Sequence, residues 1–545
     1  MKPVFFKRNR GGFGHVRVAG AAALLAGTLL ASAAGAKTIV WCSEASPEGF
    51  DPGFYTASTT FDATGHNVYN MLVEFEPGTT NPIPAAAESW TISNDGKEYT
   101  FKLRKGVKFH TTDFFTPTRE MNADDVIFSF GRQIDKQNPW NHYVAGAGYD
   151  YGDAMGFPKL IKSIEKVDDL TVKFHLSRPE APFPADIAIE SFAILSKEYA
   201  DKLRAEGRMA QLNQKPVGTG PFVFVDYRQD SVIRYKANAD YWRGRPKIDN
   251  LVFAITPDAT VRYQKLKAGE CHMMPFPNFA DIAAIEADPD LKVKGNPALN
   301  IGYLAYNTTQ PPFDKPEVRK ALNMAVNKRA IIDAVFQGKA QPAKNPIPPG
   351  MWSYNDDTKS DEYNLDKARK MLEKAGVKNL SMKVWAMPVA RPYMLNARRA
   401  AEVIQADFAK IGVKVEIVTY EWGEYIKRAA NPKHDGAIIL GWTSDNGDPD
   451  NFIGTLLSCD SVGTSNNPAA FCNAEFDELV KKAKVVSDKA ERARFYKQAQ
   501  VVFKREAPWA TIDHSLEFVP MRREVVGFVE SPMGRHDFET VDLVQ

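Results

Sequence analysis

The sequence has few cysteines, almost no net charge and, after its first 36 residues, no long apolar run. Its 545 residues include four cysteines and carry a formal net charge of +2. These features exclude a small disulfide-rich scaffold and a multi-span membrane protein. Acidic and basic residues are interspersed, so no basic patch predicts a nucleic-acid partner. The 44% hydrophobic and 25% charged residues are typical of a soluble globular protein with about two to four domains.

Signatures of catalysis and metal binding are missing as well. The chain has no G-x-S-x-G elbow and no H-E-x-x-H motif, and its nine histidines are scattered singly. Asp445, Asp448 and Asp450 form an oxygen-rich loop that lacks the spacing and terminal glutamate of an EF-hand. We therefore predict no enzyme, no metal and no cofactor. A secreted peptide hydrolase stays the alternative from another class, because catalytic triads are spatial arrangements.

The first 36 residues have the pattern of a cleavable signal peptide. Five basic residues precede an apolar run at residues 18–30, and Ala34, Gly35 and Ala36 form a small-x-small cleavage site. The run of 13 residues is shorter than the about 20 that a membrane anchor needs. Removing the five basic residues from the 69 leaves 64 against 67 acidic residues, a net charge of −3. We expect a periplasmic protein without a membrane anchor or lipid.

The four cysteines favour two disulfides in an oxidising compartment. Three pairings of Cys42, Cys271, Cys459 and Cys472 are possible. The short separation of Cys459 and Cys472 favours a local bond between them, which leaves Cys42 with Cys271. Zinc binding is disfavoured, because no C-x-x-C spacing occurs.

The hydrophobic pattern changes near residue 300. Before it, short alternating runs at residues 99–103 and 172–176 predict strands, and Asn122 is a suitable N-cap for an inserted helix. After it, longer helices alternate with strands. Residues 382–386, 413–417 and 437–440 are expected strands, separated by helices at 396–411 and 421–430. This β-α-β-α-β order predicts an α/β fold with a largely parallel sheet and two lobes.

Unusual side chains follow each of these three strands. Arg391 comes after the first strand, Trp422 after the second, and Trp442 and Asp445 after the third. Ligands bind beyond the carboxyl ends of strands in open α/β sheets. Arg391 is suited to a carboxylate and Asp445 to an ammonium group, with the tryptophans as walls. Each residue alone is more often an exposed loop residue, a turn cap or core; their co-location predicts a site for a small zwitterion.

Several longer segments carry a family resemblance. The segments NADDVIFSF, GTGPF, IPPGMWSYNDD, WAMPVARPY, VTYEWGEYIKRA and GWTSDNGDPDNF resemble the family 5 extracellular solute-binding proteins of bacterial ABC importers, in particular the dipeptide-binding branch. The resemblance implies two α/β lobes of the class II type, with an extra subdomain in lobe I. Lobe I would comprise residues 37–297 and 517–545, and lobe II residues 298–516. Two crossover hinge strands would lie near residues 297–307 and 512–519.

The resemblance also implies roles for individual residues. Asp445 would bind the α-amino group of a dipeptide and Arg391 its carboxylate. Ser58 stands where dipeptide binders commonly have glycine. Further ligand-binding positions are expected at Thr56, Pro392, Tyr393, Trp422, Trp442, Thr443 and Ser444. The cysteine pattern is similar as well and supports the pairing given above.

The resemblance finally implies partners for the chain. We expect it to act as a monomer that delivers its ligand to a membrane permease. A tripeptide, 5-aminolevulinate and haem stay the alternative ligands.

Overall fold

A computed structural model of the chain describes residues 36–544. The predicted signal peptide lies outside the described residues, except for Ala36. Within the described part, no helix has both the length and the apolar character needed to cross a membrane. The fold is mixed α/β, with separate sheets in the two halves of the chain.

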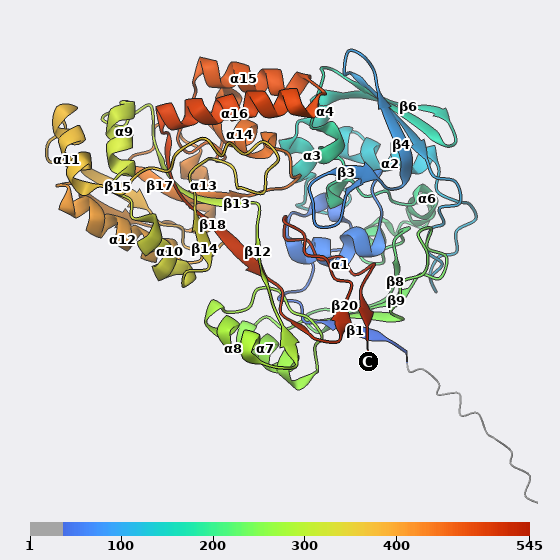
Figure 1. Ribbon diagram of the computed structural model, residues 1–545. Helices are drawn as coiled ribbons and strands as arrows, with labels where there is room; N and C mark the ends of the chain where they lie inside the picture. Colours follow the sequence, from blue (N-terminus) through green and yellow to red (C-terminus); the bar gives the residue numbers. More distant parts are fainter. Residues whose placement is uncertain (1–35, 545) are drawn as a thin grey trace, which may run out of the picture. The chain divides into compact units, whose positions relative to one another are not determined.

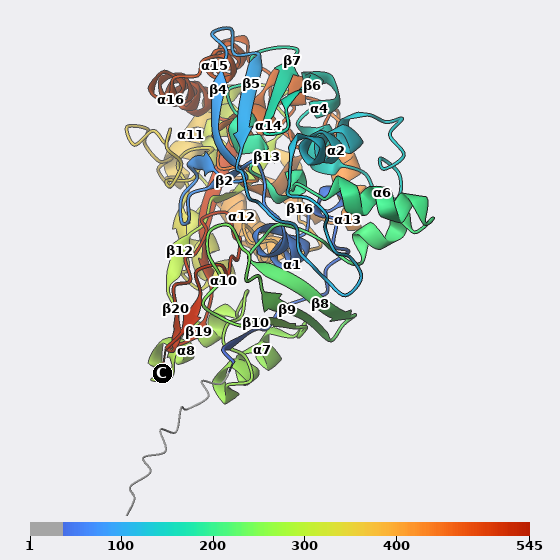
Figure 2. The same ribbon diagram turned by 90° about the vertical axis from the view of Figure 1, so that its right-hand side faces the viewer.

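The first half contains two four-stranded sheets. One has the order β1-β10-β9-β8, in which β1 and β10 are parallel and the other pairs antiparallel. The other is antiparallel with the order β4-β5-β7-β6, and Figure 2 shows β4 and β5 side by side. The strands are β1 (Thr38–Trp41), β4 (Ala87–Ile92), β5 (Glu98–Leu103), β6 (Ile161–Asp168), β7 (Thr171–Leu176), β8 (Phe222–Arg228), β9 (Val232–Ala237) and β10 (Asn250–Ala254). The strands predicted in β5 and β7 are therefore confirmed.

Helices are inserted between these strands, as the sequence predicts. In α2 the Asn122 side chain accepts a hydrogen bond from the Asp124 backbone N–H, while the Asp125 carboxylate accepts one from the Asn122 N–H, a reciprocal cap. The helices are α1 (Ser58–Val68), α2 (Ala123–Ile134), α3 (Asp150–Ala154), α4 (Phe157–Leu160), α5 (Phe183–Asp186), α6 (Lys197–Ala205), α7 (Ala259–Ala268) and α8 (Ile282–Ala287). Two short strands, β2 (Val73–Phe75) and β3 (Pro82–Pro84), pair with each other.

The second half is built on one seven-stranded sheet. Its order is β12-β18-β13-β17-β15-β16, with β14 also paired to β18. The strands are β12 (Gly295–Pro297), β13 (Asn300–Tyr306), β14 (Ala340–Pro342), β15 (Ser381–Trp385), β16 (Lys414–Val418), β17 (Ala437–Thr443) and β18 (Trp509–Phe518). β15 is parallel to both β16 and β17, which confirms the predicted parallel arrangement. β17 runs three residues beyond the expected end, because it pairs with β13 as far as Asn300 opposite Thr443.

Long helices connect and flank this sheet. α15 and α16 lie side by side (Figure 1). The helices are α9 (Pro316–Asn323), α10 (Lys328–Phe336), α11 (Leu365–Lys374), α12 (Ala397–Lys410), α13 (Trp422–Ala429), α14 (Asp450–Leu457), α15 (Ala474–Val485) and α16 (Lys489–Glu506). α9 ends at Asn323, and Asn327 caps α10 by accepting a hydrogen bond from the Ala330 N–H at 3.0 Å.

Two antiparallel chain segments run between the halves. β11 (Leu291–Lys292) pairs with β19 (Met521–Arg522), and β12 pairs with the end of β18. The two segments come from distant parts of the sequence, as expected for crossover strands. The range expected for the first crossing, near residues 297–307, includes the start of β13 at Asn300. The exact lobe limits stay a prediction.

The C-terminal segment returns to the first strand. The Trp41 ring lies 4.6 Å from the His536 ring and 5.4 Å from the Phe538 ring, measured between centroids. Lys37 Nζ is 2.7 Å from Asp542 Oδ1. The last strands, β20 (Val525–Val526) and β21 (Asp542–Leu543), pair with each other. The first and last described segments therefore share one core.

Both predicted disulfides are present. Cys42 is bonded to Cys271 and Cys459 to Cys472, with Cα–Cα distances of 5.8 and 4.4 Å. The first bond ties β1 to the segment after α7. The second closes a short loop between α14 and α15.

Candidate functional site

The loops after β15, β16 and β17 meet around two adjoining cavities. The first, of about 280 Å³, is lined by Arg391, Tyr393, Trp422 and Trp442. The second, of about 230 Å³, is lined by Thr56, Ser58 and Ser444. Pro392, Thr443 and Asp445 line both. All ten residues predicted from the sequence therefore border one of these two cavities; their roles toward a ligand stay a prediction.

Two facing glycines let the Arg391 loop lie against the sheet. Gly302 of β13 is directly opposite Gly441 of β17. A Cβ at Gly441 would overlap the Tyr393 ring, and a Cβ at Gly302 would lie 2.6 Å from the Tyr393 carbonyl oxygen. Any larger residue at either position would therefore push the loop away from the strands.

Asp445 is held by hydrogen bonds at both carboxylate oxygens. Asn451 Nδ2 donates to Oδ2 at 2.9 Å, and the Tyr151 hydroxyl donates to Oδ1 at 3.1 Å. The Asp445 N–H in turn donates to Asn451 Oδ1 at 2.9 Å. Burial raises the pKa of Asp445, while these two side-chain hydrogen bonds and the charge of Arg535 partly oppose the rise. A ligand cation would stabilise the ionised carboxylate.

Trp442 hydrogen-bonds to Asn451, the same side chain that holds Asp445. Its indole Nε1–H donates to Asn451 Oδ1 at 2.9 Å. Sequence analysis places Trp442 in a loop, but the structure places it in β17 opposite Ile301. Its ring is thus fixed by strand pairing at the backbone and by Asn451 at the indole.

Arg391 has an aromatic neighbour and no acidic one. Its guanidinium carbon lies 4.9 Å from the centre of the Trp422 ring, a cation–π arrangement. Its backbone exchanges hydrogen bonds with Met394 at 3.1 and 2.8 Å. Among residues 36–544, no carboxylate is within ion-pair distance of this guanidinium. Burial raises the pKa of the neighbouring Tyr393 to about 12, so its hydroxyl stays neutral. The site therefore holds an oriented cation suited to a carboxylate.

Several residues of the 230 Å³ cavity come from distant segments and are not predicted from the sequence. Tyr151 comes from α3, and Arg535 comes from the C-terminal segment. Arg535 Nη2 donates to the Asp445 carbonyl oxygen at 2.7 Å, and Arg535 Nε lies 2.6 Å from Glu190 Oε1. Phe276, Asp62 and Glu517 also line this cavity. No local motif marks these residues, since only the tertiary fold brings them to Asp445.

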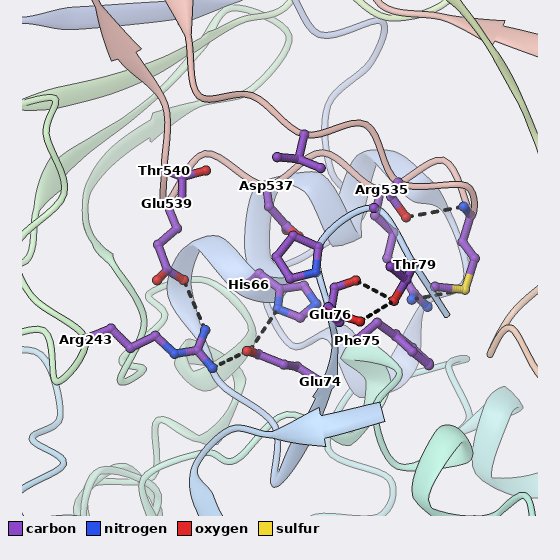
Figure 3. A pocket seen from close by; sticks show the side chains of 15 residues that line it. His66, Glu74, Phe75, Glu76, Thr79, Arg243, Arg535, Asp537, Glu539 and Thr540 are labelled. Carbon is purple, nitrogen blue, oxygen red and sulfur yellow. Dashed lines mark hydrogen bonds and ion pairs between the residues drawn. The ribbon is translucent and has the colours of Figure 1, made fainter. Parts of the chain in front are cut away.

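A separate charged cluster lies beside Arg535 (Figure 3). It surrounds a small cavity of about 90 Å³. Arg243 pairs with Glu74 and lies 3.3 Å from Glu539. His66 Nδ1 is 3.9 Å from Glu74 Oε2 and His66 Nε2 is 3.7 Å from Glu190 Oε1. The acidic and basic side chains of this cluster are therefore paired with one another.

The other aspartates of the Asp445 loop have internal partners. Asp448 accepts two hydrogen bonds of 2.8 Å from the Arg492 guanidinium. Asp450 Oδ2 lies 3.0 Å from Lys484 Nζ. The described residues contain no group of three or more His, Cys, Asp or Glu side chains placed to hold a metal ion. Asp448 and Asp450 therefore fix the loop and the start of α14.

Comparisons with known proteins identify the family of the chain. Residues 81–464 match the family model "Bacterial extracellular solute-binding proteins, family 5 Middle". The chain is 53% identical to the dipeptide-binding protein of Escherichia coli strain K12, over 95% of this chain and 97% of the relative. It is 49% identical to heme-binding protein A of Haemophilus influenzae, over 93% and 92%. The solved dipeptide-binding protein of Pseudoalteromonas sp. SM9913 in complex with Met-Leu has a TM-score of 0.79 and 40% identity, covering 93% of this chain and all of that structure.

Proposed function

The chain belongs to the family 5 bacterial extracellular solute-binding proteins, and from this premise we propose that it is a receptor for dipeptides that serves an ABC importer. The protein is extracytoplasmic, and the signal-peptide pattern supports a periplasmic location. It would capture a dipeptide between its two lobes and deliver it to a membrane permease. Its relatives are solute-binding proteins rather than enzymes, which supports binding without catalysis.

One observation carries the proposal: Asp445 and Arg391 line the same cavity. Asp445 would accept hydrogen bonds from the ligand ammonium group, and Arg391 would donate to its carboxylate. An extended residue spans about 3.5 Å, so partners fixed at both ends select the number of residues between them. The anchors follow β17 and β15, which are neighbours in the sheet, so their separation is set by strand pairing.

The two anchors account for only part of the affinity. A hydrogen bond to a charged group contributes about 1.5 to 3 kcal/mol, whereas micromolar binding needs about 8 kcal/mol. The remainder would come from backbone hydrogen bonds, from the tryptophan walls and from closure, which removes water from the cavity. The crossover segments β11–β19 and β12–β18 would form the hinge.

The function is tested by identifying what the protein binds. Native mass spectrometry of protein purified without denaturation would reveal a retained ligand, and calorimetry would compare Ala-Ala, Ala-Ala-Ala and 5-aminolevulinate. A haem titration followed by absorbance tests the ligand named for the Haemophilus relative. We expect Ala-Ala to bind at least tenfold more tightly than Ala-Ala-Ala. Absence of dipeptide binding would overturn the proposal, and release of free alanine from Ala-Ala would indicate a hydrolase.

A further inference from the structure

Glu517 is a carboxylate on the wall of the 230 Å³ cavity. It is the second-to-last residue of β18 and pairs with Asn296 of β12. Within residues 36–544 its side chain makes no hydrogen bond and no ion pair. Gly534 leaves room for it: both carboxylate oxygens lie 3.1 Å from the point that a Cβ at Gly534 would occupy. Burial raises the pKa of Glu517 to about 7, with the nearby His536 charge opposing the rise. The position is therefore suited to an added cation.

The other charged groups of the 230 Å³ cavity are already engaged. Asp62 Oδ2 is 2.8 Å from His536 Nδ1, and Arg535 is bound by Glu190 and by the Asp445 carbonyl. Of the three carboxylates that line this cavity, only Asp445 and Glu517 have no ion-pair partner among the described residues. Asp445 is assigned to the ligand ammonium group, which leaves Glu517 for a second positive charge.

The arrangement of the cavities indicates which part of a ligand would reach Glu517. Arg391 lines only the 280 Å³ cavity, Glu517 does not line that cavity, and Asp445 lines both. A dipeptide held at Asp445 and Arg391 would lie in the 280 Å³ cavity. The first residue of the peptide would then lie beside the 230 Å³ cavity. Glu517 also borders a further cavity of about 530 Å³. A long side chain on the first residue would thus have room to extend.

We propose that Glu517 makes the receptor prefer dipeptides whose first residue carries a cationic side chain, lysine or arginine. The inference deepens the proposed function and rests on it. A carboxylate that gains an ammonium or guanidinium partner in a partly closed cavity forms a charge-assisted hydrogen bond. A glutamate side chain on the ligand would meet repulsion at the same point.

Calorimetric titration of the full-length mature protein tests the preference. The ligands are Lys-Ala, the neutral norleucine-Ala of similar length, Glu-Ala, Ala-Lys and Ala-Ala. The wild type should bind Lys-Ala about tenfold more tightly than norleucine-Ala, and Glu-Ala more weakly than either. In Glu517→Gln this tenfold ratio should vanish, and continued binding of Ala-Ala would show that the variant is folded. Glu530→Gln is the matched control, because Glu530 lines none of the three cavities.

Each contrary result has a distinct meaning. Equal affinities of the wild type for Lys-Ala and norleucine-Ala, or a ratio that survives in Glu517→Gln, would overturn the inference. The same loss in Glu530→Gln would indicate a general electrostatic effect and would overturn it too. A preference for Ala-Lys over Lys-Ala would refute the assignment to the first residue. If Ala-Ala itself did not bind, the proposed function would fail first and the preference with it.

Discussion

Asn451 and Asp445 exchange two hydrogen bonds. The Asn451 amide donates to the Asp445 carboxylate, and its carbonyl oxygen accepts from the Asp445 N–H, both at 2.9 Å. The same carbonyl accepts from the Trp442 indole at 2.9 Å. One side chain of α14 thus orients the proposed ammonium anchor and one wall of the cavity. Its amide donor also favours the ionised form of Asp445.

Replacing Asn451 should therefore weaken binding without direct contact to the ligand. In Asn451→Ala we expect about a tenfold loss of affinity for Ala-Ala and a loss of about 1 to 2 kcal/mol in the free energy of unfolding. Calorimetry and urea denaturation measure the two effects. Asn467→Ala is the control, because Asn467 hydrogen-bonds in the Cys459–Cys472 loop instead. Asn467→Ala should lower the free energy of unfolding and keep the wild-type affinity for Ala-Ala. Equal losses of affinity in both variants would contradict the positioning role of Asn451.

Each proposed anchor should matter only for its own end of the peptide. Asp445→Asn should reduce the affinity for Ala-Ala about 10- to 100-fold, and Arg391→Ala should have a similar effect. Acetylating the peptide amino group should abolish the difference between wild type and Asp445→Asn, and amidating the carboxyl group should do so for Arg391→Ala. Arg399→Ala, which alters an exposed arginine of α12, is the control. Tight wild-type binding of the acetylated peptide would exclude the ammonium role of Asp445.

Ser58 should limit the size of the second cavity. It is the first residue of α1 and lines the 230 Å³ cavity. Ser58→Gly removes its side chain, so the affinity for Trp-Ala should rise about threefold relative to Ala-Ala. Thr59→Gly is the control, because Thr59 lines neither cavity. It should destabilise the helix by a similar amount, about 0.5 to 1 kcal/mol, and leave the ratio of the two affinities unchanged. An unchanged Trp-Ala to Ala-Ala ratio in Ser58→Gly would show that Ser58 does not set the size limit.

The two disulfides should differ in their effect on stability. The bonded cysteines are 229 residues apart in the Cys42–Cys271 pair and 13 apart in the Cys459–Cys472 pair. Chain entropy then predicts a loss of about 3 kcal/mol for a Cys459→Ser, Cys472→Ser variant and a loss about 2.5 kcal/mol larger for Cys42→Ser, Cys271→Ser. Urea denaturation of both double variants measures the difference. A larger loss for the short loop would contradict the entropic argument.

His536 should make stability depend on alkaline pH. Burial alone would lower the pKa of His536, but the carboxylates of Asp62, Glu44 and Glu517 outweigh it and raise the pKa to about 9. The stabilisation is therefore fully present below the ordinary histidine value of about 6.5 and is lost as pH rises through about 9. We expect the urea midpoint to fall between pH 7 and 10 in wild type, and to fall less in His536→Gln.

The exposed His142 provides the matched control for this pH effect. His142→Gln should retain the wild-type slope of the urea midpoint against pH, because His142 is exposed and no carboxylate among the described residues lies within ion-pair distance of its ring. Parallel curves for wild type and His536→Gln would mean that the His536–Asp62 pair does not contribute.

Local signals in the sequence predict much of this fold. The Asn122 cap and the alternation in β5 and β7 each arise within one short element, and β15, α12, β16, α13 and β17 follow one another along the chain. The parallel order of the three strands then brings Arg391, Trp422 and Asp445 together. These features are predictable because short-range geometry determines them.

Long-range pairing produces the features that the sequence does not reveal. Tyr151 donates to Asp445 from 294 residues away, and Arg535 reaches the same loop from the C-terminal segment. β17 is extended through Trp442 by its pairing with β13, which no periodicity within β17 indicates. Glu517 lines the cavity only because β18 crosses beside β12. Such contacts depend on the whole topology.

The contact of Trp41 with Phe538 also sets the order in which the chain can complete its folding. Phe253 contacts the Trp41 ring from the intervening chain, but a nascent chain that has not yet reached Phe538 lacks the ring contacts that His536 and Phe538 provide. The ion pair of Lys37 with Asp542 forms equally late. The last residues to be synthesised thus complete the packing around the first strand, so a chain that ends before Phe538 would leave this part of the core unfilled.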